Sequence, residues 1–138
     1  MKAPSTVRFE TQLDAVDWEA LRLELIDDNF HNGRSTLQLK ESFENSSHCV
    51  MAFEGLRCIG TVRALSDGVG NAYVVDLWTL SSFRNTGTGT KLMQLLLKEL
   101  PGQHVYLQTE DAIDFYQRMG FKKQPEGLSI IVGTYLGN

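Results

Sequence analysis

The stretch from Phe83 to Leu92, FRNTGTGTKL, places two glycines and three threonines between an arginine and an apolar helical pattern. It follows YVVDLWTL, Tyr73 to Leu80, which has the apolar character of a central strand. Glycine loops that open a helix are typical of phosphate-binding sites, because the first N–H groups of a helix have no intrahelical partner. The order strand, glycine loop, helix predicts a crossover to a parallel strand, and this decides the fold class.

Two common phosphate-binding loops do not fit this stretch well. A P-loop requires Lys and then Ser or Thr directly after its second glycine, but here threonine follows Gly89 and leucine follows Lys91. A dinucleotide fingerprint requires a third glycine at position 92, which is leucine, although Glu110 lies about twenty residues further on, where a ribose-binding acid would be. The remaining pattern is Arg-x-x-Gly-x-Gly, from Arg84 to Gly89.

The hydrophobic pattern along the rest of the chain predicts one mixed α/β domain over residues 1–138, with a central sheet and about four flanking helices. Strands are expected at Thr6–Thr11, His48–Phe53, Cys58–Leu65, Tyr73–Leu80, His104–Gln108 and Leu128–Tyr135. Helix starts are expected at Asp14 or Asp17, at a Ser35–Gln38 capping box, and after the glycine loop. A further short helix is expected at Asp111–Met119, ended by Gly120. The first half of the sheet is antiparallel, and Tyr73–Leu80 is parallel to His104–Gln108.

Composition and charge exclude several classes of protein. The chain has 138 residues, of which 42% are hydrophobic, and it contains no apolar run long enough to span a membrane, which favours a cytoplasmic protein without a membrane partner. A net charge of -4 argues against nucleic acid as the main partner. Cys49 and Cys58 are expected to be free thiols, because a two-residue turn at Gly55-Leu56 pairs Cys58 with Phe53. Neither cysteine has a metal-ligand spacing to the other or to a histidine, so no metal is expected.

The Arg84–Gly89 pattern resembles the acetyl-coenzyme A motif of the GNAT acetyltransferase superfamily, which also lies between a strand and a helix. AIDFYQRMGF, Ala112 to Phe121, is similar to the later segment of that family, in which a short helix carries a tyrosine ahead of Gly-Phe. The order of elements from Thr6 to Tyr135 also follows the family fold. TVRALSD, VVDLWTL and the PEG at Pro125–Gly127 look most like a small plant and cyanobacterial branch that includes arylalkylamine and protein-lysine acetyltransferases.

The resemblance implies that acetyl-coenzyme A is the cosubstrate. Free amide groups at the start of the helix can surround its pyrophosphate without any side-chain charge. The cofactor-binding residues expected in this loop are Arg84, Asn85, Thr86, Gly87, Thr88, Gly89 and Thr90. The resemblance also implies that Leu77, Trp78 and Thr79 present backbone groups to the pantetheine arm, where the two parallel strands splay apart. Arg84 either contacts a phosphate or holds the loop, and the usual family proline is replaced by Ser81.

Two residues are the catalytic candidates. The resemblance places Tyr116 at the leaving sulfur, and a phenol with a usual pKa of about 10 is protonated at neutral pH and can donate to a thiolate; alternatively Tyr116 packs with Phe115. Asp76 is the one charged residue of an apolar strand, so its carboxylate is either a general base or a structural group paired with Arg63. Glu110 and Glu126 are weaker candidates for the base.

The sequence therefore favours an N-acetyltransferase that transfers the acetyl group directly to a primary amine in a ternary complex, with no acyl-enzyme. The acceptor is a small-molecule amine or a protein amino group, and Trp78 either lines its pocket or packs in the core. A non-catalytic domain that senses acetyl-coenzyme A is the alternative. The oligomeric state does not follow from the sequence.

Overall fold

The computed structural model describes residues 6–137 of the chain. The chain divides into two compact units, Met1–Leu107 and Gln108–Asn138, and each unit is described here by itself. Among the described residues, the first unit contains the sheet and three of the four α-helices, and the second contains the remaining short α-helix. The expected mixed α/β class and the expected helix number are both confirmed.

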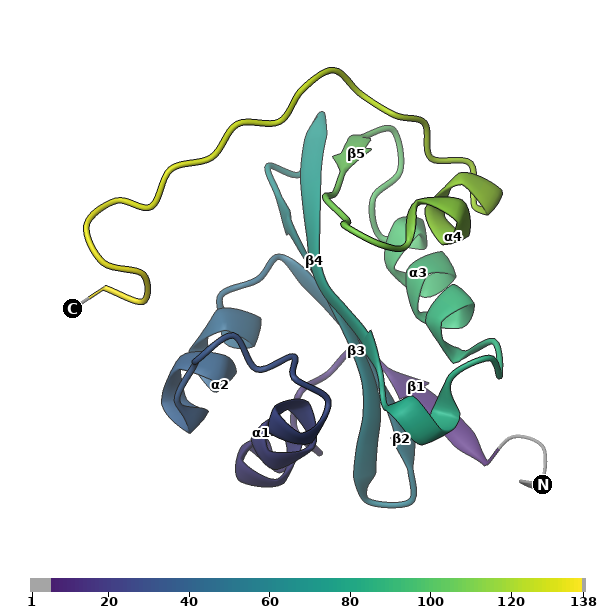
Figure 1. Ribbon diagram of the computed structural model, residues 1–138. Coiled ribbons are helices and arrows are strands. Elements are labelled where there is room, and N and C mark those ends of the chain that lie inside the picture. The colour runs from purple at the N-terminus through teal and green to yellow at the C-terminus, as the bar shows by residue number, and fades with distance from the viewer. Residues whose placement is uncertain (1–5, 138) are drawn as a thin grey trace. The chain divides into compact units, whose positions relative to one another are not determined.

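The first unit is built on a five-stranded sheet with the order β1-β2-β3-β4-β5. Its strands are β1 Val7–Glu10, β2 His48–Glu54, β3 Arg57–Ser66, β4 Asn71–Thr79 and β5 His104–Tyr106. Helices α1 Trp18–Asp27 and α2 Thr36–Glu44 lie on one face, and α3 Thr88–Lys98 lies on the other (Figure 1). The neighbours from β1 to β4 pair antiparallel, and β4 pairs parallel with β5, as the crossover predicted.

Local signals in the sequence set the first elements. Asp17, one of the two expected caps, accepts a hydrogen bond from the Ala20 amide 3.0 Å away and starts α1. The predicted Ser35–Gln38 capping box starts α2, with both of its reciprocal hydrogen bonds present. In the β2–β3 hairpin Phe53 pairs with Cys58, so the two cysteines are apart and both are free. These contacts depend only on residues close in sequence, which is why the sequence predicted them.

Helix α3 packs closely on the sheet because one strand residue lacks a side chain. Leu92, Met93 and Leu96 form the buried stripe of α3. A Cβ atom at Gly60 of β3 would lie 3.0 Å from Leu92 Cδ1 and 3.3 Å from the Trp78 carbonyl oxygen. Glycine at this position therefore lets the helix approach the strand and brings the start of α3 to the end of β4.

A β-bulge interrupts β4 and separates its two halves. Arg63 pairs with Val75 and Thr61 pairs with Trp78, so one residue of β3 lies opposite two of β4, Asp76 and Leu77. Asp76 has a φ of 58°, in the left-handed region. An extra residue of this kind bends a strand and changes the direction of the side chains beyond it. The parallel pairing with β5 covers only Asn71 to Tyr73, because β5 ends at Tyr106, whereas β4 continues to Thr79.

The second unit differs from the sequence prediction at its end. Helix α4 spans Ile113–Arg118, within the predicted Asp111–Met119, and Gly120 follows it with a φ of 103°. The strand expected at Leu128–Tyr135 is wrong: this segment has no strand pairing, and Leu128 is 95% exposed and Val132 is 87% exposed. β-branched residues favour extended backbone, but a strand forms only where another strand supplies hydrogen bonds.

Candidate acetyl-coenzyme A site

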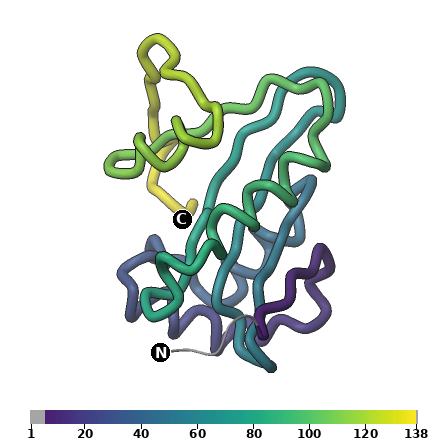
Figure 2. Tube along the Cα trace, turned by 90° about the vertical axis from the view of Figure 1, so that its right-hand side faces the viewer, coloured from purple at the N-terminus to yellow at the C-terminus, as the bar shows by residue number. Residues whose placement is uncertain are grey.

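The candidate site begins at the end of β4 and continues through the glycine loop into α3. A short 3-10 helix, η1 Ser81–Phe83, follows β4, and in Figure 2 this segment lies beside the end of α1. Gly87 then caps α3 with a φ of 88° and makes no side-chain capping bond. The first helical hydrogen bond runs from the Lys91 amide to the Gly87 carbonyl oxygen, 3.0 Å away. The amides of Thr88, Gly89 and Thr90 therefore precede the first bonded amide and can donate to a ligand.

Hydroxyl groups of the loop hold its backbone in place. The Thr86 hydroxyl donates to the Phe83 carbonyl oxygen at 2.5 Å and lies 3.0 Å from the Thr88 hydroxyl. Asn85 adopts a φ of 63°, a region in which Asn is more common than most other residues. The side chains from Asn85 to Thr90 carry no charge. Asn85, Thr86 and Gly87 are exposed, whereas Thr88 is buried and the two residues after it are half-buried. A helix start with free donors and a left-handed glycine fits a pyrophosphate group.

Arg84 is held by the protein. Its Nε donates to the Thr79 carbonyl oxygen at 3.0 Å, and its Nη2 lies 3.4 Å from Asp28 Oδ2. The sequence left two roles open for Arg84, a phosphate contact or a contact that holds the loop. These contacts are of the second kind. Half of the Arg84 side chain remains exposed, at 53%. Asp28 was not found by sequence reasoning, because in Asp27-Asp28-Asn29 it looks like an ordinary solvated helix end.

The backbone of Leu77 to Thr79 lies on the part of β4 beyond its pairing with β5. The opposite edge of β4 is hydrogen-bonded to β3, where Thr61 pairs with Trp78 and Gly60 pairs with Thr79. The Trp78 indole is only 2% exposed, which corresponds to the core-packing alternative, and its Nε1 donates to Asp28 Oδ2 at 3.0 Å. The predicted contacts of Leu77, Trp78 and Thr79 with pantetheine stay predictions.

Asp76 lies at the bulge and is paired twice. Its Oδ2 accepts from Arg63 Nε at 2.7 Å and from Arg34 Nη1 at 2.8 Å, while its Oδ1 accepts from Arg34 Nη2 at 3.3 Å. The Asp76 side chain is 8% exposed and that of Arg34 is 6% exposed. The ion pair with Arg63 is the contact expected if Asp76 has a structural role. Arg34 was missed, because nothing in the sequence connects residues so far apart.

Tyr116 belongs to the second unit, in α4. Its ring makes edge contacts with Phe115 and Phe121, with centroids 5.1 Å and 5.7 Å apart. Burial raises the pKa of Tyr116 above its usual value, and the negative charge of Asp111 raises it further. The phenol is therefore protonated at neutral pH, as an acid for a leaving thiolate must be. Its catalytic role and that of Asp76 stay predictions.

Residues 6–137 contain neither a candidate metal cluster nor a candidate membrane-spanning helix. In that range His, Cys, Asp and Glu form no group of three or more that could hold a metal ion. No helix in the same range is long and apolar enough to cross a bilayer.

Known proteins share both the sequence pattern and this architecture. The acetyltransferase (GNAT) family matches residues 13–121. The uncharacterized N-acetyltransferase ycf52 of Porphyra purpurea is 34% identical over 76 residues, which are 52% of this chain and 44% of that protein. Histone acetyltransferase TAP1 of Glycine max is 30% identical over 86 residues, which are 59% of this chain and 37% of that protein. The chain thus spans less than half the length of these two relatives.

Solved structures show the same fold. A GNAT family acetyltransferase from Streptococcus pneumoniae has a TM-score of 0.78 and 24% identity, covering 94% of this chain and 100% of its own. Glucosamine-6-phosphate N-acetyltransferase from Arabidopsis thaliana has a TM-score of 0.72 and 16% identity, covering 92% of this chain and 99% of its own. The mixed five-stranded sheet with its helices is the fold that these acetyltransferase structures share. The chain belongs to the acetyltransferase (GNAT) family.

Proposed function

We propose that the protein is an N-acetyltransferase that uses acetyl-coenzyme A and transfers the acetyl group directly to a primary amine in a ternary complex. The observation that carries the proposal is the start of α3, where the Thr88, Gly89 and Thr90 amides are free to donate close to the part of β4 that extends beyond its pairing with β5. Family membership supports the same chemistry. Acetyl-coenzyme A, when bound, supplies the acetyl thioester.

Two backbone segments of the chain bind different parts of coenzyme A. The loop from Asn85 to Thr90 binds the pyrophosphate through N–H groups and the positive end of α3, without a side-chain charge. The Leu77–Thr79 backbone orients the pantetheine arm. Arg84 maintains the loop through its bonds to Thr79 and Asp28. This arrangement binds an anion with fixed dipoles that do not have to reorganise.

Tyr116 donates the proton that the departing thiolate requires. Its raised pKa keeps the phenol protonated over the neutral range, so activity limited by this group is lost only at pH above about 10, the usual value for a tyrosine. Asp76 is the candidate acceptor of the amine proton, but its two ion pairs favour the structural role for this carboxylate.

Direct transfer is supported by the state of the cysteines. Burial raises the pKa of Cys49 to about 11, although the positive charge of Arg63 opposes the shift. Burial also raises the pKa of Cys58 to about 12. A thiol is nucleophilic as its thiolate, so both groups are inert at neutral pH and neither suits an acyl-enzyme.

The acceptor is a primary amine on a small molecule or on a protein. The acids of the first half of the chain favour a cationic acceptor of either kind. The name of the Glycine max relative, a histone acetyltransferase, supports including protein lysines among the candidates. Arylalkylamines and polyamines complete the set of acceptors to be tried.

Calorimetry with coenzyme A, followed by thiol release from acetyl-coenzyme A with each amine, tests the proposal. Binding and amine-dependent release are expected. Absence of binding by the folded protein would contradict the proposal, and binding without turnover on any amine would support the non-catalytic sensing domain.

Tyr116→Phe should lower kcat by about a hundredfold or more with little change in coenzyme A affinity. Unchanged kcat under conditions where chemistry is rate-limiting would remove the catalytic assignment.

A further inference from the structure

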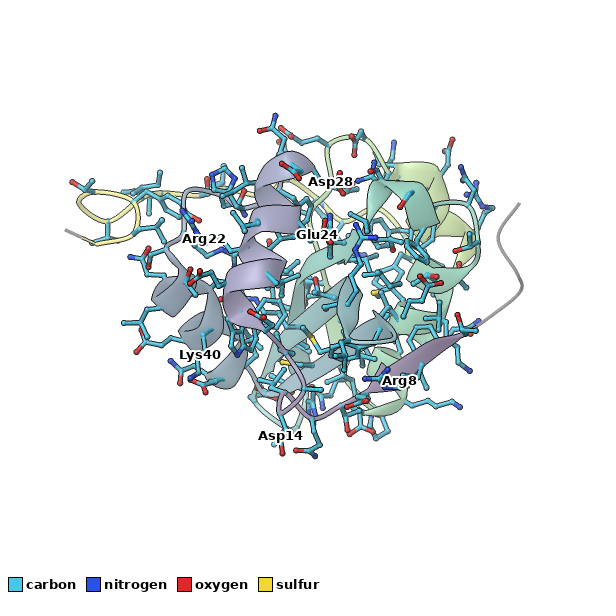
Figure 3. The ribbon with its side chains drawn as sticks, turned by 90° about the horizontal axis from the view of Figure 1, so that it is seen from below. Arg8, Asp14, Arg22, Glu24, Asp28 and Lys40 are labelled. Carbon is cyan, nitrogen blue, oxygen red and sulfur yellow. The ribbon has the colours of Figure 1, made fainter. Side chains whose placement is uncertain are left out.

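One carboxylate oxygen connects the end of α1 to the beginning of the proposed cofactor loop. Figure 3 shows Asp28 at the end of α1, one turn after Glu24. Asp28 Oδ2 accepts from the Trp78 indole at 3.0 Å, from the Ser81 amide at 3.0 Å and from Arg84 Nη2 at 3.4 Å. The Asp28 side chain is only 9% exposed. The end of α1 and the distant stretch from Trp78 to Arg84 are thereby joined at one atom.

Each of the three donors depends on this acceptor. The Trp78 indole is buried, so its N–H would lose its acceptor without Asp28. Ser81 is the first residue of η1, and Leu80, the residue before it, provides no side-chain cap. Arg84 would keep its bond to the Thr79 carbonyl oxygen but lose its charged partner. For the buried Trp78 indole, removal of the acceptor costs more than the bond itself, because its N–H stays desolvated.

We propose that Asp28 is a positioning residue for the coenzyme A pyrophosphate: it holds the end of β4, the start of η1 and Arg84 so that the loop meets the phosphates in its binding conformation. The proposal rests on the proposed function. Asp28 does not touch the cofactor in this role. It acts because preformed donors bind an anion without the entropic cost of ordering the loop first.

The charge of Asp28 acts in the opposite direction to its positioning effect. A carboxylate near a phosphate site weakens binding of an anion, so replacing it by a neutral group favours binding through charge alone. If Asp28 positions the loop, replacing it should instead weaken the binding of coenzyme A. Asp27 provides the matched control, because it is exposed, adjacent in sequence and carries the same charge. Asp27→Asn measures the charge effect, and the difference between Asp28→Asn and Asp27→Asn isolates the positioning effect.

The test titrates isotope-labelled wild type, Asp27→Asn, Asp28→Asn and Asp28→Ala with coenzyme A and with pantetheine, which lacks the pyrophosphate, and follows both by NMR. We expect Asp27→Asn to bind coenzyme A as tightly as wild type or slightly more tightly. Asp28→Asn should bind it about tenfold more weakly, since one charge-assisted contact of about 1.4 kcal/mol corresponds to this factor. Asp28→Ala should bind it more weakly still. Pantetheine affinity should be unchanged in all four proteins.

The free proteins provide a readout that does not depend on the ligand. The chain has two tryptophans, and only the indole N–H resonance of Trp78 should move in Asp28→Asn, while that of Trp18 stays in place. Affinity of the Asp28 variants within twofold of Asp27→Asn would overturn the inference. An equal loss of coenzyme A and pantetheine affinity would also overturn it, as a general structural effect. If wild type binds no coenzyme A, the proposed function itself fails.

Discussion

The two polar regions at the end of β4 satisfy their hydrogen bonds in opposite ways. At the bulge, the Asp76 side chain is only 8% exposed, and its two oxygens accept from Arg34 and Arg63. In the glycine loop, the side chains from Asn85 to Thr90 are uncharged, and three amides at the start of α3 precede the first helical bond. The charged groups at the bulge are paired with one another, whereas the amides at the start of α3 remain available to a ligand.

The difference favours the uncharged loop over the charged bulge as the proposed anion site. A buried carboxylate between two guanidiniums has few remaining interactions to make, and breaking it destabilises the fold. A helix start with a left-handed glycine costs little to form and leaves N–H groups directed outward. The first region should therefore respond to mutation through stability, and the second through ligand affinity.

The largest expected effect is that of Asp76→Asn on stability. The amide leaves two partly buried guanidiniums without a counter-charge, so the free energy of unfolding should fall by about 3–5 kcal/mol. Urea unfolding measures it, with Asp27→Asn as an exposed control. A variant that keeps its stability and loses the acidic limb of the pH-rate profile would instead identify Asp76 as the general base.

The next effect is that of Gly89→Asp on binding. An acidic side chain in the first turn of α3 is favourable for the helix, so stability should be kept. The same charge lies where the phosphates are proposed to bind, so affinity for coenzyme A should fall by about a hundredfold, or ~2.7 kcal/mol. Gly89→Ala is the uncharged control and should bind nearly as wild type. Calorimetry showing unchanged affinity for Gly89→Asp would remove the loop assignment.

Gly87→Ala tests the backbone of the loop and should have an intermediate effect. Nothing lies within 4 Å of a Cβ atom at Gly87, so the substitution adds strain at a φ of 88° and no clash. The strain should cost about 1–2 kcal/mol of stability. Gly87→Asn should cost less, because Asn tolerates the left-handed region. Thermal unfolding of the pair would contradict this account if both variants were equally destabilised.

The smallest effect is expected for Thr86→Val, which removes the hydroxyl bonded to the Phe83 carbonyl oxygen. The loss of one such bond should cost about 0.5–1.5 kcal/mol and weaken coenzyme A binding only slightly. Thr86→Ser retains the hydroxyl and should restore wild-type stability. If valine and serine behave alike in denaturant unfolding, the hydroxyl does not maintain the loop.

Much of the fold was predictable because its signals are local. The capping box at Ser35, the hairpin register at Phe53 and Cys58, and the crossover from β4 to β5 follow from neighbouring residues and from chain geometry. The Leu128–Tyr135 segment was not predictable in this way. Its β-branched residues favour a strand locally, but strand formation depends on a partner elsewhere in the chain.

The sequence by itself determined the class of the protein, its glycine loop and the position of an acid within an apolar strand. Each of these depends on residue type and spacing along the chain. Only the tertiary structure decided which groups satisfy that acid and which oxygen holds the loop: Arg34 with Asp76, and Asp28 with Trp78, Ser81 and Arg84. Buried polar groups must find partners, but the partner is chosen by which side chains the packed helices and sheet bring within hydrogen-bond distance.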